Sequence, residues 1–312
     1  MGRCERELVL RGVVLRKAGG AWDVHVENGT VVSAVLRGRV KHAAGIKLAV
    51  GDEVLLRTEG SSWAIAEILP RRSQLVRRAP GGARGVRVVV ANVDQALVVF
   101  AAALPDPNLR MLDRFLVVAE ASGVAARIVV NKIDLVDPED VRQQFALYEA
   151  IGYPLHFTSC RLGIGLDELR RALEGRTSAL MGPSGVGKSS LMNAMYPGLD
   201  LRVGEVSASL GKGRHTTVGA YLHPLPGGGY VADTPGLREI GLWGLPPTAL
   251  DTCFPEMRPH LNRCRFPDCR HTTEPGCAVR EAVGSGAIAI ARYESYRKLL
   301  DEVLAAEREK YD

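Results

Sequence analysis

The first seventy residues alternate between short apolar stretches and turns that are rich in glycine. The clearest apolar stretches cover residues 13–15, 31–36 and 54–56, and the clearest turns are Glu27-Asn28-Gly29 and Gly51-Asp52. About five short strands joined by such turns predict a small closed barrel. An OB-fold and an SH3-like barrel fit equally well, because the periodicity does not distinguish between them.

From about residue 87 the pattern changes to continuous apolar runs that alternate with helical spacing. Five runs have the pattern of buried strands: residues 88–91, 96–101, 127–130, 154–157 and 178–181. Amphipathic spacing predicts helices between them, at residues 108–121, 138–150 and 166–173. Alternating strands and helices predict an α/β layer with a mainly parallel sheet.

A third pattern begins after residue 245, where Pro246-Pro247 precedes a loop rich in cysteine and proline. The last helix is expected near residues 287–304, with one apolar face formed by Tyr293, Tyr296, Leu300 and Val303. We therefore expect three domains: a barrel at 1–75, an α/β domain at 76–245 and a mainly α domain at 246–312.

Composition narrows the class of protein. The chain has 312 residues, of which 46% are hydrophobic and 24% are charged, a balance typical of packed soluble proteins. The longest apolar run, residues 96–104, is much shorter than the roughly 20 residues of a transmembrane helix. The first seven residues include acidic side chains and no apolar stretch, so we expect no signal peptide. A cytoplasmic protein without membrane contact is expected.

A phosphate-binding loop is the sharpest chemical signal in the chain. The segment matches G-x4-G-K-[ST] and lies between an apolar run and a predicted helix. It consists of Gly182, Pro183, Ser184, Gly185, Val186, Gly187, Lys188, Ser189 and Ser190. Glycines allow backbone N–H groups to surround phosphate oxygens at the amino terminus of a helix. We expect Lys188 to contact the β- and γ-phosphates and Ser189 to bind Mg²⁺.

A second motif predicts that the base is guanine. Asn131, Lys132, Ile133 and Asp134 form an N-K-x-D sequence directly after a predicted strand. Asp134 would accept two hydrogen bonds from the guanine edge that adenine cannot donate, at about 1.5–3 kcal/mol for each bond to a charged group. Lys132 would pack along the base. A weaker match follows the next strand, where Thr158, Ser159 and Cys160 resemble the loop that supports the guanine oxygen.

A third motif predicts how the γ-phosphate is sensed. Asp233-Thr234-Pro235-Gly236 matches D-x-x-G, in which Asp233 would hold Mg²⁺ through water and the Gly236 N–H would contact the γ-phosphate. Between the phosphate loop and this motif lies Gly213-Arg214-His215-Thr216-Thr217. One threonine, Thr217 in preference to Thr216, is expected to complete the Mg²⁺ shell when GTP is bound.

These motifs occur in a rotated order. A GTPase normally presents the phosphate loop, the threonine, D-x-x-G and then N-K-x-D, whereas here N-K-x-D comes first. A sheet can be cut and rejoined without changing its site if the original termini lie close together. The order therefore predicts a circularly permuted GTPase domain, in which D-x-x-G leads directly into the C-terminal module.

Three thiols and an imidazole near the carboxyl terminus predict a metal site. Cys264, Cys269, His271 and Cys277 could form a closed tetrahedral shell, which suits structural Zn²⁺. The spacing is not a common finger spacing, and Cys253 and His260 are the main competing ligands.

Together, the permuted motif order, the Gly-Arg-His-Thr-Thr segment, the cysteine cluster and the predicted barrel closely resemble the ribosome small-subunit-dependent GTPases of bacteria. The resemblance covers nearly the whole chain. It implies an OB-fold, a permuted GTPase domain and a C-terminal domain with zinc on three cysteines and one histidine. It further implies a role in late maturation of the 30S subunit, which would stimulate GTP hydrolysis.

The residue that orients the attacking water is not the usual glutamine, because Leu237 occupies the position after D-x-x-G. His215 is the best candidate, since an imidazole in the threonine loop can donate or accept a proton. The resemblance points to the same residue, although an exposed loop histidine remains the alternative.

Mild positive charge suggests where RNA binds. The net charge is +5, and residues 1–75 carry 12 basic and 8 acidic side chains. Backbone contacts to 16S rRNA are expected from basic residues in and after the barrel: Arg37, Arg39, Lys41, Lys47, Arg71, Arg72, Arg77 and Arg78. No oligomer signal is present, and we expect a monomer. The alternative function is a GTP-binding RNA-remodelling module in which hydrolysis is incidental.

Overall fold

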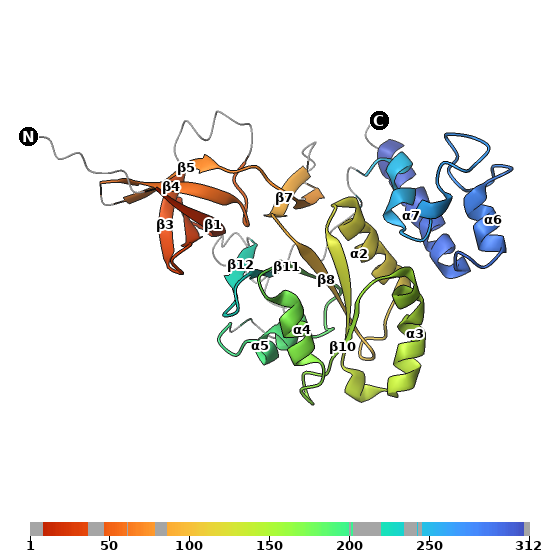
Figure 1. Ribbon diagram of the computed structural model, residues 1–312, viewed down its shortest axis with the longest axis horizontal. Coiled ribbons are helices and arrows are strands. Elements are labelled where there is room, and N and C mark those ends of the chain that lie inside the picture. Colours follow the sequence, from red (N-terminus) through yellow and green to blue (C-terminus); the bar gives the residue numbers. More distant parts are fainter. Residues whose placement is uncertain are drawn as a thin grey trace, which may run out of the picture.

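The structure is a computed structural model that describes residues 9–36, 47–60, 62–78, 86–199, 201, 220–233, 242 and 245–308. A barrel, a central layer of strands and helices, and a helical body follow one another along the chain (Figure 1). None of the helices in these ranges is long and apolar enough to span a membrane.

The N-terminal strands close into a five-stranded barrel in the order β1-β2-β3-β5-β4, which confirms the expected OB-like architecture. The strands are β1 (Val9–Ala18), β2 (Ala21–Val26), β3 (Val31–Leu36), β4 (Glu53–Glu59) and β5 (Ser62–Ile68). Strands β3 and β5 pair in parallel, and the other neighbours are antiparallel. Side chains that alternate along the strands fill the interior, among them Val14, Val24, Val54, Leu56 and Ile65.

A separate hairpin lies between the barrel and the main sheet. It consists of β6 (Gln74–Arg78) and β7 (Val86–Ala91), which form an antiparallel two-stranded sheet. The prediction that residues 88–91 belong to the parallel sheet was therefore wrong. An apolar run shows that a strand is buried but does not specify its neighbour, and here the Ala91 N–H donates to the barrel residue Val50.

The central sheet has the order β10-β9-β8-β11-β13-β12, with only its edge strand β12 antiparallel to its neighbour. Its strands are β8 (Gln95–Ala101), β9 (Ala125–Asn131), β10 (Leu155–Phe157), β11 (Thr177–Met181), β12 (Tyr221–Pro224) and β13 (Tyr230–Asp233). The predicted mainly parallel sheet is confirmed. Parallel pairing brings the carboxyl ends of β8, β9, β10, β11 and β13 to the same edge, where the nucleotide motifs follow them.

Helices cover both faces of this sheet (Figure 1). They are α2 (Leu109–Ala121), α3 (Pro138–Ile151), α4 (Leu166–Leu173) and α5 (Lys188–Met195). Successive residues of β8 serve opposite faces: Val98 and Phe100 pack in the core with α2 and α3, whereas Leu97 and Val99 pack with α4 and α5.

The C-terminal body is built from 3-10 turns and two helices, in agreement with the expected mainly α domain. Its elements are η4 (Pro247–Ala249), η5 (Asp251–Cys253), η6 (Arg258–His260), α6 (Ala278–Gly284) and α7 (Ile290–Arg308). The predicted apolar face of α7 is confirmed, with Tyr296, Leu300 and Val303 buried and Tyr293 partly buried. The short helix α6 was not predicted.

A buried arginine joins this body to the central domain. Arg292 of α7 is 1% exposed and lies 2.6 Å from both the Asp113 carboxylate of α2 and the Glu256 carboxylate. The Tyr148 hydroxyl also donates to Asp113, at 2.8 Å. The guanidinium is thus paired on both sides, which is what a buried charge requires.

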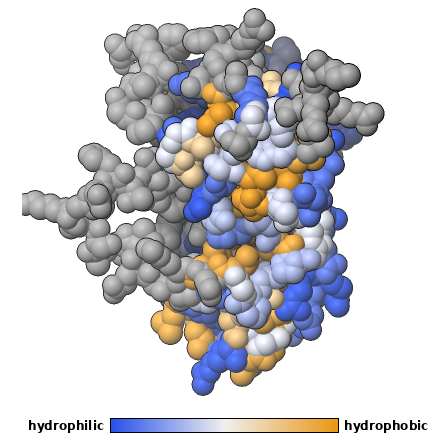
Figure 2. All heavy atoms as spheres, turned by 90° about the vertical axis from the view of Figure 1, so that its left-hand side faces the viewer, coloured by the Kyte–Doolittle hydropathy of each residue, from blue (hydrophilic) through white to orange (hydrophobic). Residues whose placement is uncertain are grey.

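The barrel packs against the β12–β13 hairpin of the central sheet. The Arg16 guanidinium lies 5.2 Å from the ring centre of Tyr221, and His25 hydrogen-bonds to Tyr230. Figure 2 shows the side of the molecule that carries the barrel, where apolar patches are interspersed with hydrophilic surface. The barrel is therefore attached to β12, which follows the Thr216/Thr217 segment in the sequence, and to β13, which ends at the first residue of D-x-x-G.

Candidate nucleotide and metal sites

The phosphate loop connects the carboxyl end of β11 to the amino terminus of α5, as predicted. Gly182 has φ +128°, and a Cβ there would lie 2.1 Å from the Val99 carbonyl oxygen. Gly187 has φ +93°, and a Cβ there would lie 2.5 Å from the Asn131 amide nitrogen. Both positions therefore require glycine, the first to pass the neighbouring strand and the second to approach the N-K-x-D segment.

Charged and hydroxyl groups of the loop gather at the start of α5. The Lys188 Nζ donates to the carbonyls of Gly182 and Pro183, at 2.8 and 2.5 Å, so the ammonium lies inside the curve of the loop. Ser189 and Ser190 are partly buried in the first turn of α5, and Ser184 is exposed. Backbone N–H groups at this helix start can bind anions.

The N-K-x-D segment and the phosphate loop are in direct contact, although more than fifty residues separate them. Asn131 is 2% exposed, and its Nδ2 donates to the Val186 carbonyl at 3.0 Å. The Lys132 Nζ donates to the Gly185 carbonyl at 2.7 Å and also to the Leu104 carbonyl. The spatial closure expected from the permuted order is present in two of these contacts, those to Val186 and Gly185 of the phosphate loop.

The loop after β10 completes this side of the site. The Ser159 hydroxyl donates to the Asp134 carboxylate at 2.6 Å, and the Thr158 hydroxyl donates to the Asn131 Oδ1 at 3.2 Å. The Ile133 N–H donates to the Thr158 carbonyl. These bonds fix the Asp134 carboxylate beside the loop that was predicted to support the guanine oxygen.

Cys160 takes part in the same arrangement through its sulfur. The thiol lies 3.5 Å from the Asn131 Oδ1. Burial raises the pKa of this thiol, so it remains protonated at neutral pH and can donate to the amide oxygen. The side chain therefore supports Asn131 from within the loop of residues 158–160, of which a backbone N–H is expected to support the guanine oxygen.

Part of the predicted site lies outside the described residues: His215, Thr216, Thr217 and Gly236, together with Leu237. Asp233 is the last residue of β13, paired in register with Tyr221. Since β13 lies next to β11, Asp233 lies at the same edge of the sheet as the phosphate loop. The backbone of the first D-x-x-G residue is thus where the prediction needs it.

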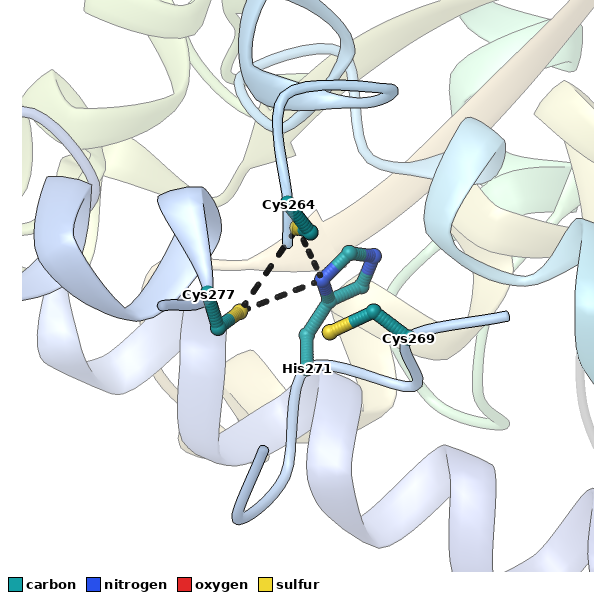
Figure 3. A group of neighbouring side chains, drawn as sticks. All are labelled: Cys264, Cys269, His271 and Cys277. Carbon is teal, nitrogen blue, oxygen red and sulfur yellow. Dashed lines mark hydrogen bonds between the residues drawn. The ribbon is translucent and has the colours of Figure 1, made fainter. Parts of the chain in front are cut away.

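The four predicted metal ligands converge on one point. The three sulfurs of Cys264, Cys269 and Cys277 and one ring nitrogen of His271 all lie within 4.8 Å of one another (Figure 3). The His271 Nδ1 is 3.3 Å from the Cys277 sulfur and 3.5 Å from the Cys264 sulfur. A tetrahedral Zn²⁺ site with S–Zn bonds of about 2.3 Å requires ligand atoms at such separations.

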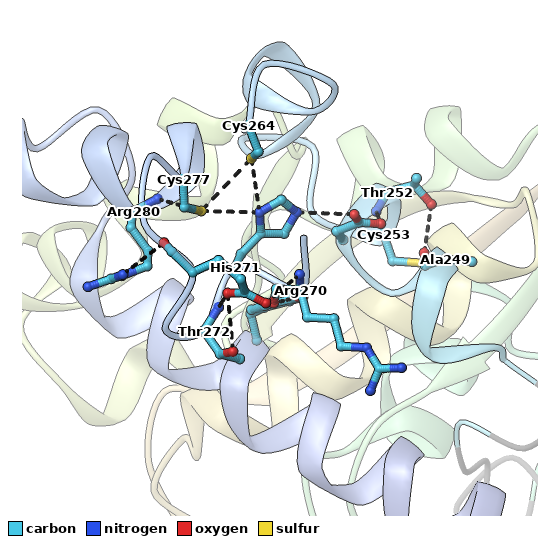
Figure 4. A network of polar contacts seen from close by, with 12 residues as sticks. Ala249, Thr252, Cys253, Cys264, Arg270, His271, Thr272, Cys277 and Arg280 are labelled. Carbon is cyan, nitrogen blue, oxygen red and sulfur yellow. Dashed lines mark hydrogen bonds and ion pairs between the residues drawn. The ribbon is translucent and has the colours of Figure 1, made fainter. Parts of the chain in front are cut away.

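Neighbouring groups orient these ligands. The other ring nitrogen of His271 lies 3.3 Å from the Asp251 carboxylate, so the imidazole bridges the cysteines and the 249–253 segment (Figure 4). Burial alone would raise the pKa of the Cys277 thiol, but the Arg280 N–H at the start of α6 and His271 lower it. A carboxylate behind a histidine and an amide behind a thiolate are typical of metal centres.

The two competing ligands do not belong to the cluster. The Cys253 thiol is buried and donates to the Ala249 carbonyl at 3.4 Å, and His260 ends a separate 3-10 turn. Asp251 and the Leu104 carbonyl are the functional contacts that the sequence did not predict. Asp251 could have been predicted, because it is an acidic residue shortly before the cysteine-rich loop. The Leu104 contact could not, because any residue type can supply a main-chain carbonyl.

Two basic residues proposed to contact RNA are engaged within the chain. The Arg71 guanidinium donates to both oxygens of the buried Asp52 carboxylate, at 2.6 and 2.9 Å. Arg72 pairs with Asp94 at 2.9 Å and with Glu53 at 3.4 Å. Arg71 is largely buried in its ion pair, whereas the side chain of Arg72 is 62% exposed, so its contact with phosphates stays a prediction.

Comparisons with known proteins agree with this geometry. Residues 68–243 match the family model described as RsgA GTPase. The small ribosomal subunit biogenesis GTPase RsgA of Gemmatimonas aurantiaca is 60% identical over 298 residues, covering 94% of this chain and 97% of that protein. Its namesake in Moorella thermoacetica is 44% identical over 304 residues, with 96% and 99% covered.

Solved structures give the same result. YjeQ from Thermotoga maritima superposes with a TM-score of 0.80 at 36% identity, covering 95% of this chain and 99% of that one. YloQ, described as a circularly permuted GTPase, gives a TM-score of 0.76 at 29% identity, with 98% of each chain covered. The phosphate loop, the permuted N-K-x-D segment and these similarities together show that the chain belongs to the RsgA GTPase family.

Proposed function

We propose that this protein hydrolyses GTP during late maturation of the 30S ribosomal subunit, that the subunit stimulates hydrolysis, and that GTP favours binding and GDP favours release. The curated relatives are named small ribosomal subunit biogenesis GTPases. The observation that carries the proposal is the pair of bonds from Asn131 and Lys132 to the phosphate loop, because it joins a guanine-reading segment to a phosphate site.

Each nucleotide residue then has a defined role. Asp134 accepts hydrogen bonds from the guanine edge, Lys132 packs along the base, and a backbone N–H of the 158–160 loop supports the guanine oxygen. Lys188 contacts the β- and γ-phosphates, while Ser189, Asp233 through water, and Thr217 or Thr216 hold Mg²⁺. Mg²⁺, when bound there, would stabilise the negative charge that develops on the phosphates during hydrolysis. The Gly236 N–H contacts the γ-phosphate.

His215 is proposed to orient the attacking water, because Leu237 cannot do so by hydrogen bonding. Removing a general base or water-positioning group typically lowers turnover by about 10²- to 10⁴-fold. The test is GTP turnover with and without 30S subunits for the native protein, His215→Ala and His260→Ala. We expect stimulation by 30S subunits in the native protein and His260→Ala, and its loss in His215→Ala. No stimulation of the native protein would instead favour a GTP-binding module in which hydrolysis is incidental.

The metal is proposed to be one structural Zn²⁺ per chain, held by Cys264, Cys269, His271 and Cys277. Three sulfurs and one nitrogen suit Zn²⁺, and all four positions of a tetrahedral shell are taken by side chains. The ion would hold together the loop before α6, which contains little regular secondary structure of its own.

The remaining proposals concern organisation and partners. The domain boundaries are proposed at 1–75, 76–245 and 246–312. The barrel is proposed to contact 16S rRNA through Arg37, Arg39, Lys41 and Lys47, of which only Lys47 lies within the described residues, where it is exposed. The protein is proposed to act as a monomer in the cytoplasm.

A further inference from the structure

Two arginines converge on one buried amide oxygen at the amino-terminal side of the central sheet. Gln95, the first residue of β8, is completely buried. Its Nε2 donates to the Ala172 carbonyl at 2.8 Å and to the Ser178 hydroxyl at 2.9 Å, which leaves its Oε1 as the acceptor on the other side. That oxygen accepts from the Arg127 Nε at 2.8 Å and from the Arg176 Nη1 at 3.5 Å.

The second hydrogen-bond acceptor of Arg127, the side chain of His156, is also uncharged. The Arg127 Nη1 lies 3.3 Å from the His156 Nε2. Since arginine only donates, this ring nitrogen must accept, and the imidazole is therefore uncharged. Burial, together with the neighbouring Arg127, lowers the pKa of His156, in agreement with a neutral ring. Neither acceptor of Arg127 thus carries negative charge.

Two carboxylates of this region, Glu168 and Asp94, contact other groups. Glu168 lies 3.3 Å from the other nitrogen of the His156 ring, and Asp94 pairs with Arg72 and accepts from the Thr177 N–H. Within the described residues, neither Arg127 nor Arg176 forms an ion pair. The shared Gln95 oxygen holds the two positive charges close together, and burial and repulsion from Arg176 lower the pKa of Arg127.

We propose that Arg127 and Arg176, here called the arginine pair, bind a backbone phosphate of RNA in the small ribosomal subunit. Two guanidinium groups can hold the oxygens of one phosphate by parallel, charge-assisted hydrogen bonds, and the anion removes their mutual repulsion. This inference rests on the proposed function and adds a contact on the GTPase domain, away from the barrel.

The position of the arginine pair favours RNA over a small free anion. Arg176 is exposed and Arg127 only partly buried, so the pair is reached from the open surface by a group that projects from a large partner. Asp94, which directly precedes Gln95, is bonded to Arg72 at the end of the barrel. RNA that contacts the barrel would therefore pass close to this side of the sheet. The nucleotide motifs lie at the opposite edge of the sheet, so RNA bound to the arginine pair would not obstruct nucleotide exchange.

The test is the affinity of the intact protein for 30S subunits, with a non-hydrolysable GTP analogue, over a series of KCl concentrations. The variants are Arg127→Gln, Arg176→Gln and, as a matched control, Arg142→Gln, which removes one exposed arginine of α3. We expect each variant of the arginine pair to weaken binding about tenfold and to make the salt dependence shallower by about one unit of log–log slope. Arg142→Gln should match the native protein, and GTP turnover without subunits should be unchanged in all three.

Three results would overturn the inference. If Arg176→Gln, whose exposed side chain makes misfolding a poor explanation, binds like Arg142→Gln, the arginine pair does not contact the subunit. If millimolar inorganic phosphate raises the melting temperature of the native protein but not of Arg176→Gln, while both bind subunits equally, the pair holds a free anion. If the native protein itself fails to bind 30S subunits, the proposed function fails as well, and this result is distinct from the other two.

Discussion

The Nδ1 of His25, in the barrel, lies 2.8 Å from the hydroxyl of Tyr230, in the hairpin of the central sheet that ends at Asp233. The two rings also meet edge to face, with their centres 5.7 Å apart. A side chain of the proposed RNA-binding barrel is therefore bonded to a strand only three residues before the aspartate expected to hold Mg²⁺. Any shift of that strand therefore moves a residue that contacts the barrel.

Tyr230→Phe removes this hydrogen bond and keeps the ring. We expect the free energy of unfolding to fall by about 1 kcal/mol, the usual net contribution of one hydrogen bond. The measurement is the free energy of unfolding by urea denaturation. Tyr221→Phe, whose ring lies under Arg16, is the variant for comparison. Equal stability of Tyr230→Phe and the native protein would show that the bond does not hold the barrel in place.

Asn131→Ala should weaken binding of GTP and GDP alike. The substitution leaves the buried Val186 carbonyl without its donor and releases the Thr158 and Cys160 side chains, so the phosphate loop loses one of its two links to the base-reading segment and keeps the bond from Lys132 to Gly185. A buried group left unpaired costs about 1–3 kcal/mol, or about ten- to a hundredfold in affinity. Titration calorimetry checks this result, with Gln143→Ala on the exposed side of α3 as the control.

The metal content of the protein should depend on the cysteines of the cluster and not on a cysteine outside it. We expect about one zinc ion per chain in the native protein and in Cys253→Ala, and none in Cys264→Ser, by elemental analysis of the purified protein. Cys264→Ser should also melt at a lower temperature, because the loop before α6 loses its cross-link. Full zinc occupancy in Cys264→Ser would rule out the proposed ligand set.

Arg292→Met should strongly destabilise the joint between α7 and α2. The change leaves the carboxylates of Asp113 and Glu256 without a positive charge, with only the Tyr148 hydroxyl still donating to Asp113. Loss of one member of a buried ion pair costs about 3–5 kcal/mol. Arg297→Met, on the exposed side of the same helix, should cost much less. Thermal unfolding and limited proteolysis of the two variants compare them directly, and similar behaviour of both would contradict this role for Arg292.

Much of the nucleotide site could be predicted because its chemistry resides in short segments. The phosphate loop and N-K-x-D each combine a strand end with residue types that only a few functions require, and their contact follows from parallel strands ending at one edge. The cysteine cluster was predictable for the same reason, because four soft ligands in one loop have few other uses.

Other features depend on tertiary partners that local sequence does not specify. The run at 88–91 is as apolar as a central strand, yet it pairs with β6. Arg71 and Arg72 look like free surface charges until the fold brings Asp52 and Asp94 beside them. Helix α6 is too short to give a periodic signal, and its start is defined by the Cys277 side chain, which accepts from the Arg280 N–H.

The most direct test of the central claim is the base preference of Asp134→Asn. The claim is that one guanine nucleotide contacts both N-K-x-D and the phosphate loop, so an amide at position 134 should prefer the xanthine edge, with its additional oxygen. Competition binding should show that the native protein selects GTP over XTP and that Asp134→Asn selects XTP over GTP. An unchanged preference for GTP in this variant would contradict the account.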